Sequence, residues 1–337
     1  MMKNNKIKAS IAGGTGYTAG ELLRILLYHP NIEIISVLSA TSVGEEISSV
    51  HRDLFGETNL KFTDKLGEPN VLFLCLGHGL SKAFLDSHPI PDSCKVIDLG
   101  NDFRLEPQYK GRNFIYGLTD TFKEQILHAN NIANPGCFAT AIQSAVAPLA
   151  KAKLIQKKIH VTAITGSTGA GKKPSETGHF SYRDHNISIY KLFSHQHIGE
   201  IKRTLCELIG EDAPQINFVP MRGDFTRGIF ASVYTKWSGI VKADGSLGTS
   251  ATDAVNLYKE YYKESPFVHI SDKDVSLKEV VNTNKVLMHI ELHQGYIHIA
   301  CVLDNLIKGA SGQAVENMNL LFGLEQTTGL KLKPSAF

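Results

Sequence analysis

The feature that most constrains the fold of this chain is a glycine-rich turn between a short strand and a helix. Residues 6–12 (KIKASIA) have the pattern of a buried strand, residues 13–20 (GGTGYTAG) form the turn, and residues 21–27 (ELLRILL) have the spacing of a buried helix. The N–H groups at such a junction can face a pyrophosphate, aided by the helix dipole. The junction predicts a dinucleotide-binding unit, although a tight turn that binds no ligand has the same pattern.

Further strands in the first half have the character of a parallel sheet. Ile32–Leu38 is strand-like, Val71–Leu76 is almost continuously apolar, and Val96–Leu99 repeats that character. Strands that are apolar on both faces and alternate with helices are typical of a parallel sheet covered on both sides. We therefore expect an α/β protein that begins with a Rossmann-type domain.

The second half predicts a different kind of sheet. Apolar residues take every second position in Val286–His293, a Gln-Gly turn follows, and Tyr296–Leu303 completes a hairpin with one packed face. Two further strands and two helices are expected, namely Lys158–Thr165, Ile229–Trp237, His197–Ile209 and Ala251–Tyr262. This pattern favours an α+β domain with a mixed or antiparallel sheet. The tail Gly309–Gly323 is again helical in pattern and is a candidate to return to the first domain.

Charge and cysteine content exclude several classes of protein. The 337 residues include 35 Lys plus Arg and 33 Asp plus Glu, so the net charge of +2 gives no reason to expect nucleic acid or an anionic membrane as a partner. No apolar run approaches the roughly 20 residues that span a bilayer. The five cysteines include no C-x-x-C pair, and no signal-peptide-like stretch precedes the first strand. We therefore expect a cytoplasmic protein without a disulfide framework.

The end of the second strand indicates which dinucleotide binds. NAD-binding folds place an acidic residue there to accept the ribose 2′-hydroxyl. In this chain Leu38 is followed by Ser39-Ala40-Thr41-Ser42, and Glu33 stands at the wrong end of the strand. Hydroxyls in place of a carboxylate favour NADP(H), because a carboxylate would repel its 2′-phosphate.

A cysteine at the start of a predicted helix is the candidate nucleophile. Cys137 follows Asn134-Pro135-Gly136 and precedes a helical pattern, so it falls in a first helical turn. Exposed N–H groups and the helix dipole stabilise a thiolate there and lower the thiol pKa. On this segment alone a structural role is equally open. The other cysteines lie in apolar strands, on a helix or beside a strand with no evident activator, and we interpret them as structural: Cys75, Cys94, Cys206 and Cys301.

Histidines in the segment SHQHIGE (residues 194–200) are candidates for a general acid, since imidazole titrates near neutral pH. His195 and His197 also suit a metal, but no third ligand lies close by. His289, Glu291 and His293 are more simply the solvated face of a half-buried strand, so we predict no metal. Residues 166–173 (GSTGAGKK) nearly match a P-loop. Lysine replaces the magnesium-binding hydroxyl and no clear helix follows, which disfavours an NTPase.

These motifs together resemble the N-acetyl-γ-glutamyl-phosphate reductase family of arginine biosynthesis, a relative of aspartate-semialdehyde dehydrogenase. The resemblance is collinear over nearly the whole chain. It is carried by GGTGYTAGELLRILLYHP (13–30), VLFLCLGHG (71–79), KVIDLGNDFRL (95–105), YGL (116–118), ANPGCFAT (133–140), TGSTGAGKK (165–173), HQHIGEI (195–201) and DNLIKGASGQAVENMNLLFG (304–323). The family's more usual GASGYTG, LPHG, SGVSGAGR and His-Arg-His read differently here, which bears on substrate recognition and leaves the nucleophile and base in place.

The resemblance implies a role for each part of the chain. Cys137 is the implied nucleophile and His197 the implied acid/base, with Tyr190 and Glu200 in support. Residues 1–136 together with 309–337 would bind NADP(H), and residues 137–308 would form the catalytic, substrate and oligomerisation domain of a homodimer or homotetramer. The expected cofactor contacts are Gly13, Thr15, Gly16, Tyr17, Thr18, Ser39, Gly77 and Gly312.

The implied reaction is the NADPH-dependent reduction of an acyl phosphate through a cysteine thioester. The substrate phosphate needs a cation, for which Arg104 is the candidate, and Arg222 and Arg227 are candidates for a substrate carboxylate. The N-acyl group, acetyl or succinyl, stays open. A sibling enzyme acting on aspartyl phosphate and an NADP-binding protein without catalysis are the alternatives.

Overall fold

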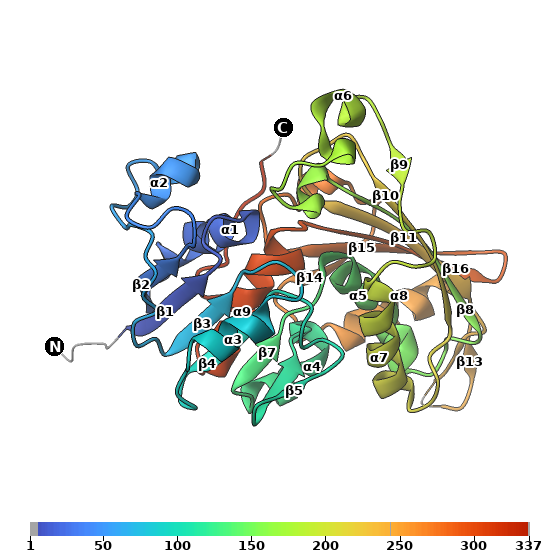
Figure 1. Ribbon diagram of the computed structural model, residues 1–337. Helices are drawn as coiled ribbons and strands as arrows, with labels where there is room; N and C mark the ends of the chain where they lie inside the picture. The colour runs from blue at the N-terminus through green and yellow to red at the C-terminus, as the bar shows by residue number, and fades with distance from the viewer. Residues whose placement is uncertain (1–5, 243, 336–337) are drawn as a thin grey trace. The chain divides into compact units, whose positions relative to one another are not determined.

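The computed structural model of the chain describes residues 6–242 and 244–335 (Figure 1). Two compact units divide the described residues: one comprises those up to Pro135 together with Ala310–Leu332, and the other comprises Gly136–Gly309 together with 333–335. The first unit is therefore built from two separate stretches of the chain, and most of the second unit is the sequence between them.

The first unit contains a seven-stranded sheet in the order β2-β1-β3-β4-β7-β6-β5. Its strands are β1 (Ile7–Ala12), β2 (Ile32–Leu38), β3 (Val71–Leu74), β4 (Lys95–Asp98), β5 (Gln108–Tyr109), β6 (Arg112–Tyr116) and β7 (Asn131–Ala133). All neighbours are parallel except β5 and β6. Because β2 and β3 lie on opposite sides of β1, the chain changes direction at the carboxyl ends of β1 and β3, where ligands bind in such sheets. The predicted Rossmann-type class is confirmed.

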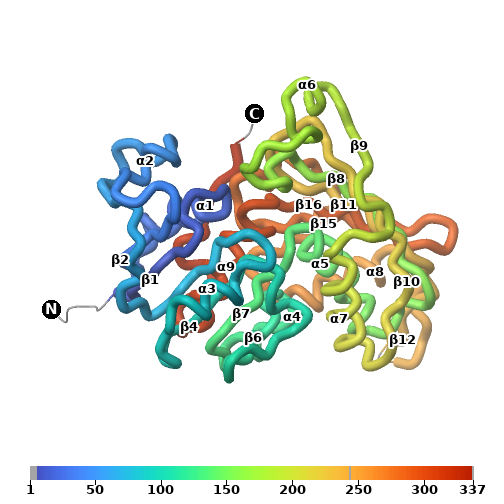
Figure 2. Tube along the Cα trace, viewed as in Figure 1, coloured from blue at the N-terminus to red at the C-terminus, as the bar shows by residue number. Residues whose placement is uncertain are grey.

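The helices of this unit are α1 (Tyr17–Leu26), α2 (Ile47–Val50), α3 (Ser81–Ser87), α4 (Thr119–Leu127) and α9 (Gly312–Leu321), with a 3₁₀ turn at Arg52–Leu54. Helix α9 packs against α1, α4 and β4, and Figure 2 shows its red trace among the blue and cyan strands. Every residue of α9 is buried, including polar ones. Their hydrogen bonds explain this: Asn317 donates to Gly117 O (2.8 Å) and Asn319 to Thr328 O (2.9 Å).

The second unit contains a mixed seven-stranded sheet in the order β14-β15-β16-β11-β8-β10-β9. Its strands are β8 (Lys158–Thr165), β9 (Ser188–Ile189), β10 (Gln215–Arg222), β11 (Ile229–Lys236), β14 (Val268–Ser271), β15 (Val286–His293) and β16 (Tyr296–Leu303). The pairs β8–β10 and β14–β15 are parallel and the others antiparallel, as predicted for a mixed sheet. The predicted hairpin turns at Gln294 and Gly295, which both have positive φ (47° and 79°), the requirement of a type I′ turn.

Three main helices belong to the second unit: α5 (Cys137–Lys151), α7 (His197–Ile209) and α8 (Ala251–Tyr261). Its shorter elements are α6 (Phe180–Arg183), the strand pair β12 (Ile240–Val241) and β13 (Leu247–Gly248), 3₁₀ turns at Ser167–Ala170, Glu176–Gly178 and Leu277–Glu279, and a π-helix that begins at Ile307. None of the helices formed by residues 6–242 and 244–335 combines the length and apolar character that a membrane crossing requires.

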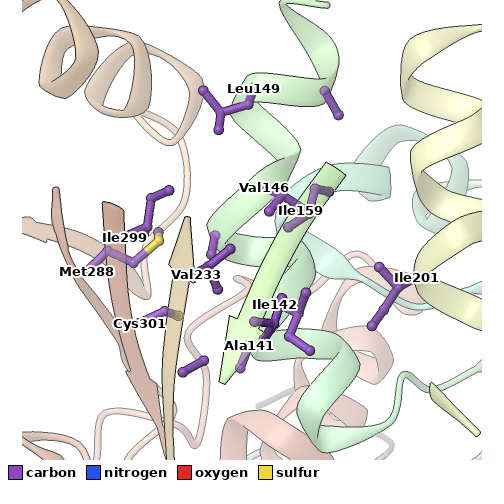
Figure 3. Close-up of a cluster of buried hydrophobic side chains, with 14 of the residues drawn as sticks. Ala141, Ile142, Val146, Leu149, Ile159, Ile201, Val233, Met288, Ile299 and Cys301 are labelled. Carbon is purple, nitrogen blue, oxygen red and sulfur yellow. The ribbon is translucent and has the colours of Figure 1, made fainter. Parts of the chain in front are cut away.

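Helix α5 runs through the middle of the core of the second unit. Figure 3 shows Ile142, Val146 and Leu149 of α5 beside apolar side chains of the sheet and of α7. Pro148 lies inside the helix and has no N–H to give to Ser144 O, and the Tyr262 hydroxyl donates to that carbonyl instead (2.7 Å). The helix is thus held on all sides, which fixes the position of its first residue, Cys137.

Candidate active site

In the first unit, glycines bring together the loops that follow β1 and β3. Gly13 has φ +80°, and a Cβ on it would lie 2.5 Å from Cys75 O. A Cβ on Gly14 would lie 2.5 Å from Val37 Cγ1, and its N–H donates to Leu38 O (2.8 Å). The turn therefore lies flat against three strand ends, and α1 begins directly after it, at Tyr17. This cradle for a pyrophosphate at a helix N-terminus fits the predicted dinucleotide.

This turn is supported by a residue that was not among the sequence predictions. His51 Nε2 donates to Gly14 O (2.7 Å), and a Cβ on Gly20 would lie 2.6 Å from His51 Nδ1. The imidazole is therefore packed between the turn and α1. Because His51 is 37 residues from Gly14 in sequence, no local pattern indicates the contact.

The other predicted cofactor residues also lie in the first unit. Thr15 and Gly16 belong to the turn, Tyr17 and Thr18 form the first turn of α1, and Gly77 lies in the loop after β3. Gly312 begins α9 beside Ser311, whose hydroxyl donates to Thr18 O (2.7 Å).

Ser39, directly after β2, uses its hydroxyl to turn the chain. Its Oγ accepts from Thr41 N (3.2 Å) and Ser42 N (3.1 Å). The end of this strand is therefore lined by hydroxyls and backbone N–H groups. Residues 39–44 include no carboxylate.

Arg104 is a buried residue of the first unit, 4% exposed. Its Nε donates to Asn134 O (2.9 Å) and its Nη2 to Leu99 O (3.1 Å). These bonds hold the backbone of the segment that leads to Cys137.

In the second unit, Cys137 is the first residue of α5 and is partly exposed. The preceding peptide is held by Glu200, whose Oε2 accepts from Gly136 N (3.0 Å). His197 Nε2 lies 3.8 Å from Glu200 Oε1, and a Cβ on Gly136 would lie only 2.3 Å from that same Nε2. The imidazole therefore rests on the peptide next to Cys137, and only glycine at position 136 leaves room for it.

A second glycine allows the chain to approach Cys137 from another direction. A Cβ on Gly309 would lie 2.8 Å from Cys137 Cβ. Gly309 N donates to Asp304 O (2.9 Å), the i→i−5 bond of the π-helix. Arg227 fixes this turn, because its Nε and Nη2 bind the buried Asp304 carboxylate at 3.1 and 3.2 Å.

Tyr190 and Arg222 lie together, and Tyr190 is close enough to Cys137 for the two to interact electrostatically. The Arg222 guanidinium carbon is 4.7 Å from the centroid of the Tyr190 ring, and among the described residues its buried Nε has no hydrogen-bond partner. Burial raises the pKa of Tyr190 to about 12, with the Cys137 sulfur adding to the effect and Arg222 opposing it. Among the described residues, the buried Nε of Arg222 thus offers a donor that no other group uses.

Comparisons with known proteins agree with this arrangement. Residues 8–129 match the family model described as semialdehyde dehydrogenase, NAD binding domain, and residues 137–305 match the one described as semialdehyde dehydrogenase, dimerisation domain. Curated relatives from Phocaeicola vulgatus and Bacteroides thetaiotaomicron, both named N-acetyl-gamma-glutamyl-phosphate reductase, are each 51% identical over 98% of this chain and 100% of their own length. The chain belongs to the N-acetyl-γ-glutamyl-phosphate reductases of the semialdehyde dehydrogenase family.

Solved structures at low sequence identity share the fold. Aspartate semialdehyde dehydrogenase from Candida albicans, solved with NADP, matches with a TM-score of 0.71 and 15% identity over 94% of this chain and 98% of that one. Aspartate semialdehyde dehydrogenase II from Vibrio cholerae matches with a TM-score of 0.68 and 17% identity, again over 94% and 98%.

The remaining cysteines of this N-acetyl-γ-glutamyl-phosphate reductase family member lie in other surroundings than Cys137. Burial raises the pKa of Cys75 to about 12 and that of Cys94 to about 11, and it also raises the pKa of Cys301. Cys206 lies on α7, partly buried. The three fully buried thiols are therefore protonated at neutral pH and serve as small apolar side chains.

Proposed function

We propose that this protein reduces N-acetyl-γ-glutamyl phosphate with NADPH, releasing N-acetylglutamate 5-semialdehyde and phosphate in arginine biosynthesis. The names of the curated relatives support this assignment of the substrate. The observation that carries the chemistry is the grouping of Cys137, His197 and Glu200 around the Gly136 peptide.

In the proposed mechanism Cys137 acts as the nucleophile. Its place in the first turn of α5 exposes it to N–H groups and to the positive end of the helix dipole, which favour the thiolate. The thiolate attacks the γ-carbonyl carbon, the C–O bond to phosphate breaks, and a thioester forms on Cys137. NADPH, when bound, supplies the hydride that reduces this thioester.

His197 moves the proton in the proposed reaction. It protonates the oxygen of the thiohemiacetal formed on Cys137 and takes that proton back as the C–S bond breaks, which releases the aldehyde and restores the thiolate. Glu200 holds both partners in place, because one carboxylate oxygen accepts from Gly136 N while the other faces His197 Nε2. We assign Tyr190 a supporting role as the surface on which Arg222 lies.

Among the candidate arginines, we propose Arg222 as the one that binds an anionic group of the substrate. Arg227 is paired with the Asp304 carboxylate, and Arg104 donates to two backbone carbonyls. Arg222 has a buried Nε that finds no partner in the described part of the chain, and it lies beside Tyr190. A carboxylate or phosphate would satisfy this donor through charge-assisted hydrogen bonds.

We propose that residues 1–136 with 309–337 bind NADP(H) and that residues 137–308 form the catalytic and oligomerisation domain. The match to an NAD binding domain and the glycine cradle support the first part, and the match to a dimerisation domain supports a homodimer or homotetramer. The contacts proposed for the cofactor are Gly13, Thr15, Gly16, Tyr17, Thr18, Ser39, Gly77 and Gly312. A cytoplasmic location, where thiols stay reduced, suits a nucleophilic cysteine.

The test is a side-by-side assay in the reverse direction. Phosphate-dependent reduction of NADP is measured with N-acetylglutamate semialdehyde, N-succinylglutamate semialdehyde and aspartate semialdehyde. We expect the highest kcat/KM with the acetyl substrate. A higher value with the succinyl or aspartyl compound reassigns the substrate, and no reduction with any of the three while NADPH still binds contradicts an enzymatic function.

A further inference from the structure

His195 is a buried polar residue that the proposed mechanism does not use. It is 4% exposed and lies in a cage of aromatic rings. Its ring centroid is 5.5 Å from Phe138, 5.4 Å from Phe218 and 5.7 Å from Tyr190, all with edge-on geometry. A phenylalanine would fill such a cage as well and would leave no polar atom to desolvate, so the ring nitrogens require an explanation.

One nitrogen supports the backbone of His197. His195 Nδ1 accepts from His197 N at 3.2 Å. A backbone N–H only donates, so Nδ1 carries no proton and the neutral ring holds its proton on Nε2. Because α7 begins at His197, the bond satisfies one of the N–H groups that a helix leaves without a partner at its first turn.

The surroundings keep the ring neutral. Burial, together with the positive charges of Lys191 and Arg222, lowers the pKa of His195 to about 4. The titratable groups around the ring are these two cations, the Tyr190 phenol and the His197 imidazole, whose ring centroid is 4.6 Å away. A protonated His195 would lose the bond to His197 N and would place a third positive charge among them.

We propose that His195 is a positioning residue: its neutral Nδ1 holds the first turn of α7 so that the His197 imidazole rests on the Gly136 peptide beside Cys137. The proposal rests on the proposed role of His197 as acid/base. His195 itself exchanges no proton with the substrate.

Two variants separate the acceptor from the shape of the ring. In His195→Asn the amide oxygen stands where Nδ1 stands, so the acceptor is kept and the aromatic contacts are lost. In His195→Phe the aromatic contacts are kept and the acceptor is lost. A displacement of His197 by about 1 Å costs about 100-fold in rate. We therefore expect kcat to fall 10- to 100-fold in His195→Phe with KM nearly unchanged, and less than threefold in His195→Asn.

The pH profile of kcat, the thermal unfolding midpoint and an NMR titration distinguish a positioning role of His195 from a purely structural one. The pH profile of kcat is expected to shift in His195→Phe and to return to that of the wild type in His195→Asn, whereas a purely structural role would lower the thermal midpoint and leave the profile in place. NMR of the full chain labelled with ¹³C at histidine Cε1 is expected to show a His195 signal, assigned by its loss in His195→Asn, that does not titrate above pH 5.5.

A His195 signal that titrates above that pH, or a His195→Phe enzyme with wild-type kcat and profile, overturns the proposal. The NMR result does not depend on the substrate. A wild-type enzyme inactive on all three semialdehydes therefore contradicts the proposed function, while a titrating His195 contradicts this inference.

Discussion

Substituting Gly136 by alanine adds one methyl group at the point where His197 meets the nucleophile's peptide. The backbone tolerates the change, because Gly136 has φ −73° and ψ 151°, an extended conformation open to alanine. The new Cβ would lie 2.3 Å from His197 Nε2, 2.5 Å from Cε1 and 2.7 Å from Cδ2. Ordinary contact between such atoms begins near 3.4 Å, so the imidazole must retreat by about 1 Å.

A displacement of that size sets the expected loss. About 1 Å of misplacement costs roughly 100-fold in rate, or about 2.7 kcal/mol of transition-state stabilisation. Overpacking of a buried site costs about 1–3 kcal/mol of stability in addition. Steady-state kinetics with phosphate-dependent NADP reduction measure the first quantity and denaturant unfolding the second. NADPH affinity, measured by fluorescence titration, is expected to stay unchanged.

The control is the same substitution in a His197→Asn background. His197→Asn alone is expected to lower turnover by about 10²- to 10⁴-fold, the usual range for a general acid/base. The amide lacks Nε2 and Cε1, the two atoms that the new methyl group meets most closely, so the further loss from Gly136→Ala should be smaller than in the wild type. If the loss of kcat in the double variant equals the product of the two single losses, the glycine does not act through His197. A Gly136→Ala enzyme within threefold of the wild type would also refute the argument that Gly136 makes room for His197.

Three further substitutions test other parts of the molecule. Cys137→Ser is expected to lose nearly all turnover and still bind NADPH, since a hydroxyl lacks the population and nucleophilicity of a thiolate; retention of more than a tenth of the wild-type rate would remove Cys137 from its role. Ser39→Asp keeps an acceptor for the Thr41 and Ser42 N–H groups but adds a negative charge, so kcat/KM for NADPH should fall about ten- to a hundredfold more than that for NADH, and equal losses would contradict the cofactor assignment. Arg227→Met leaves the buried Asp304 carboxylate without its cation and should lower the free energy of unfolding by about 3 kcal/mol, at the low end for a broken buried pair because backbone N–H groups still bind Asp304; an unchanged unfolding midpoint would show that the pair contributes nothing.

Helices and strands could be predicted where the same face of the element is packed along its whole length. Helix α7 and both strands of the β15–β16 hairpin have the predicted bounds, since one face of each is packed from end to end. Helix α1 begins at Tyr17, four residues before the predicted start, because the first turn of a helix needs exposed N–H groups more than apolar side chains. Strand β10 escaped prediction because Pro220 and the polar ends of QINFVPMR obscure its alternation.

Candidate site residues could be named from the sequence where their chemistry is local. The first-turn position of Cys137 and the paired histidines are visible in short segments. The contacts that arrange them join distant parts of the chain: Gly136 binds Glu200, 64 residues away, and Gly309 reaches Cys137 through a π-helix. Periodicity carries no information on such contacts, and a glycine required by a neighbour far along the chain is indistinguishable in sequence from one required by a turn.

Because the first unit is built from two separate stretches of the chain, its core is completed late during synthesis. A nascent chain that has reached Gly309 contains every strand of the second sheet, while the first sheet still lacks α9. The surface that this fully buried helix covers on α1, α4 and β4 stays open until Ala310–Leu332 has been synthesised. Domains usually fold in the order of their synthesis; here the core of the domain begun first is closed only after every strand of the second sheet has been made.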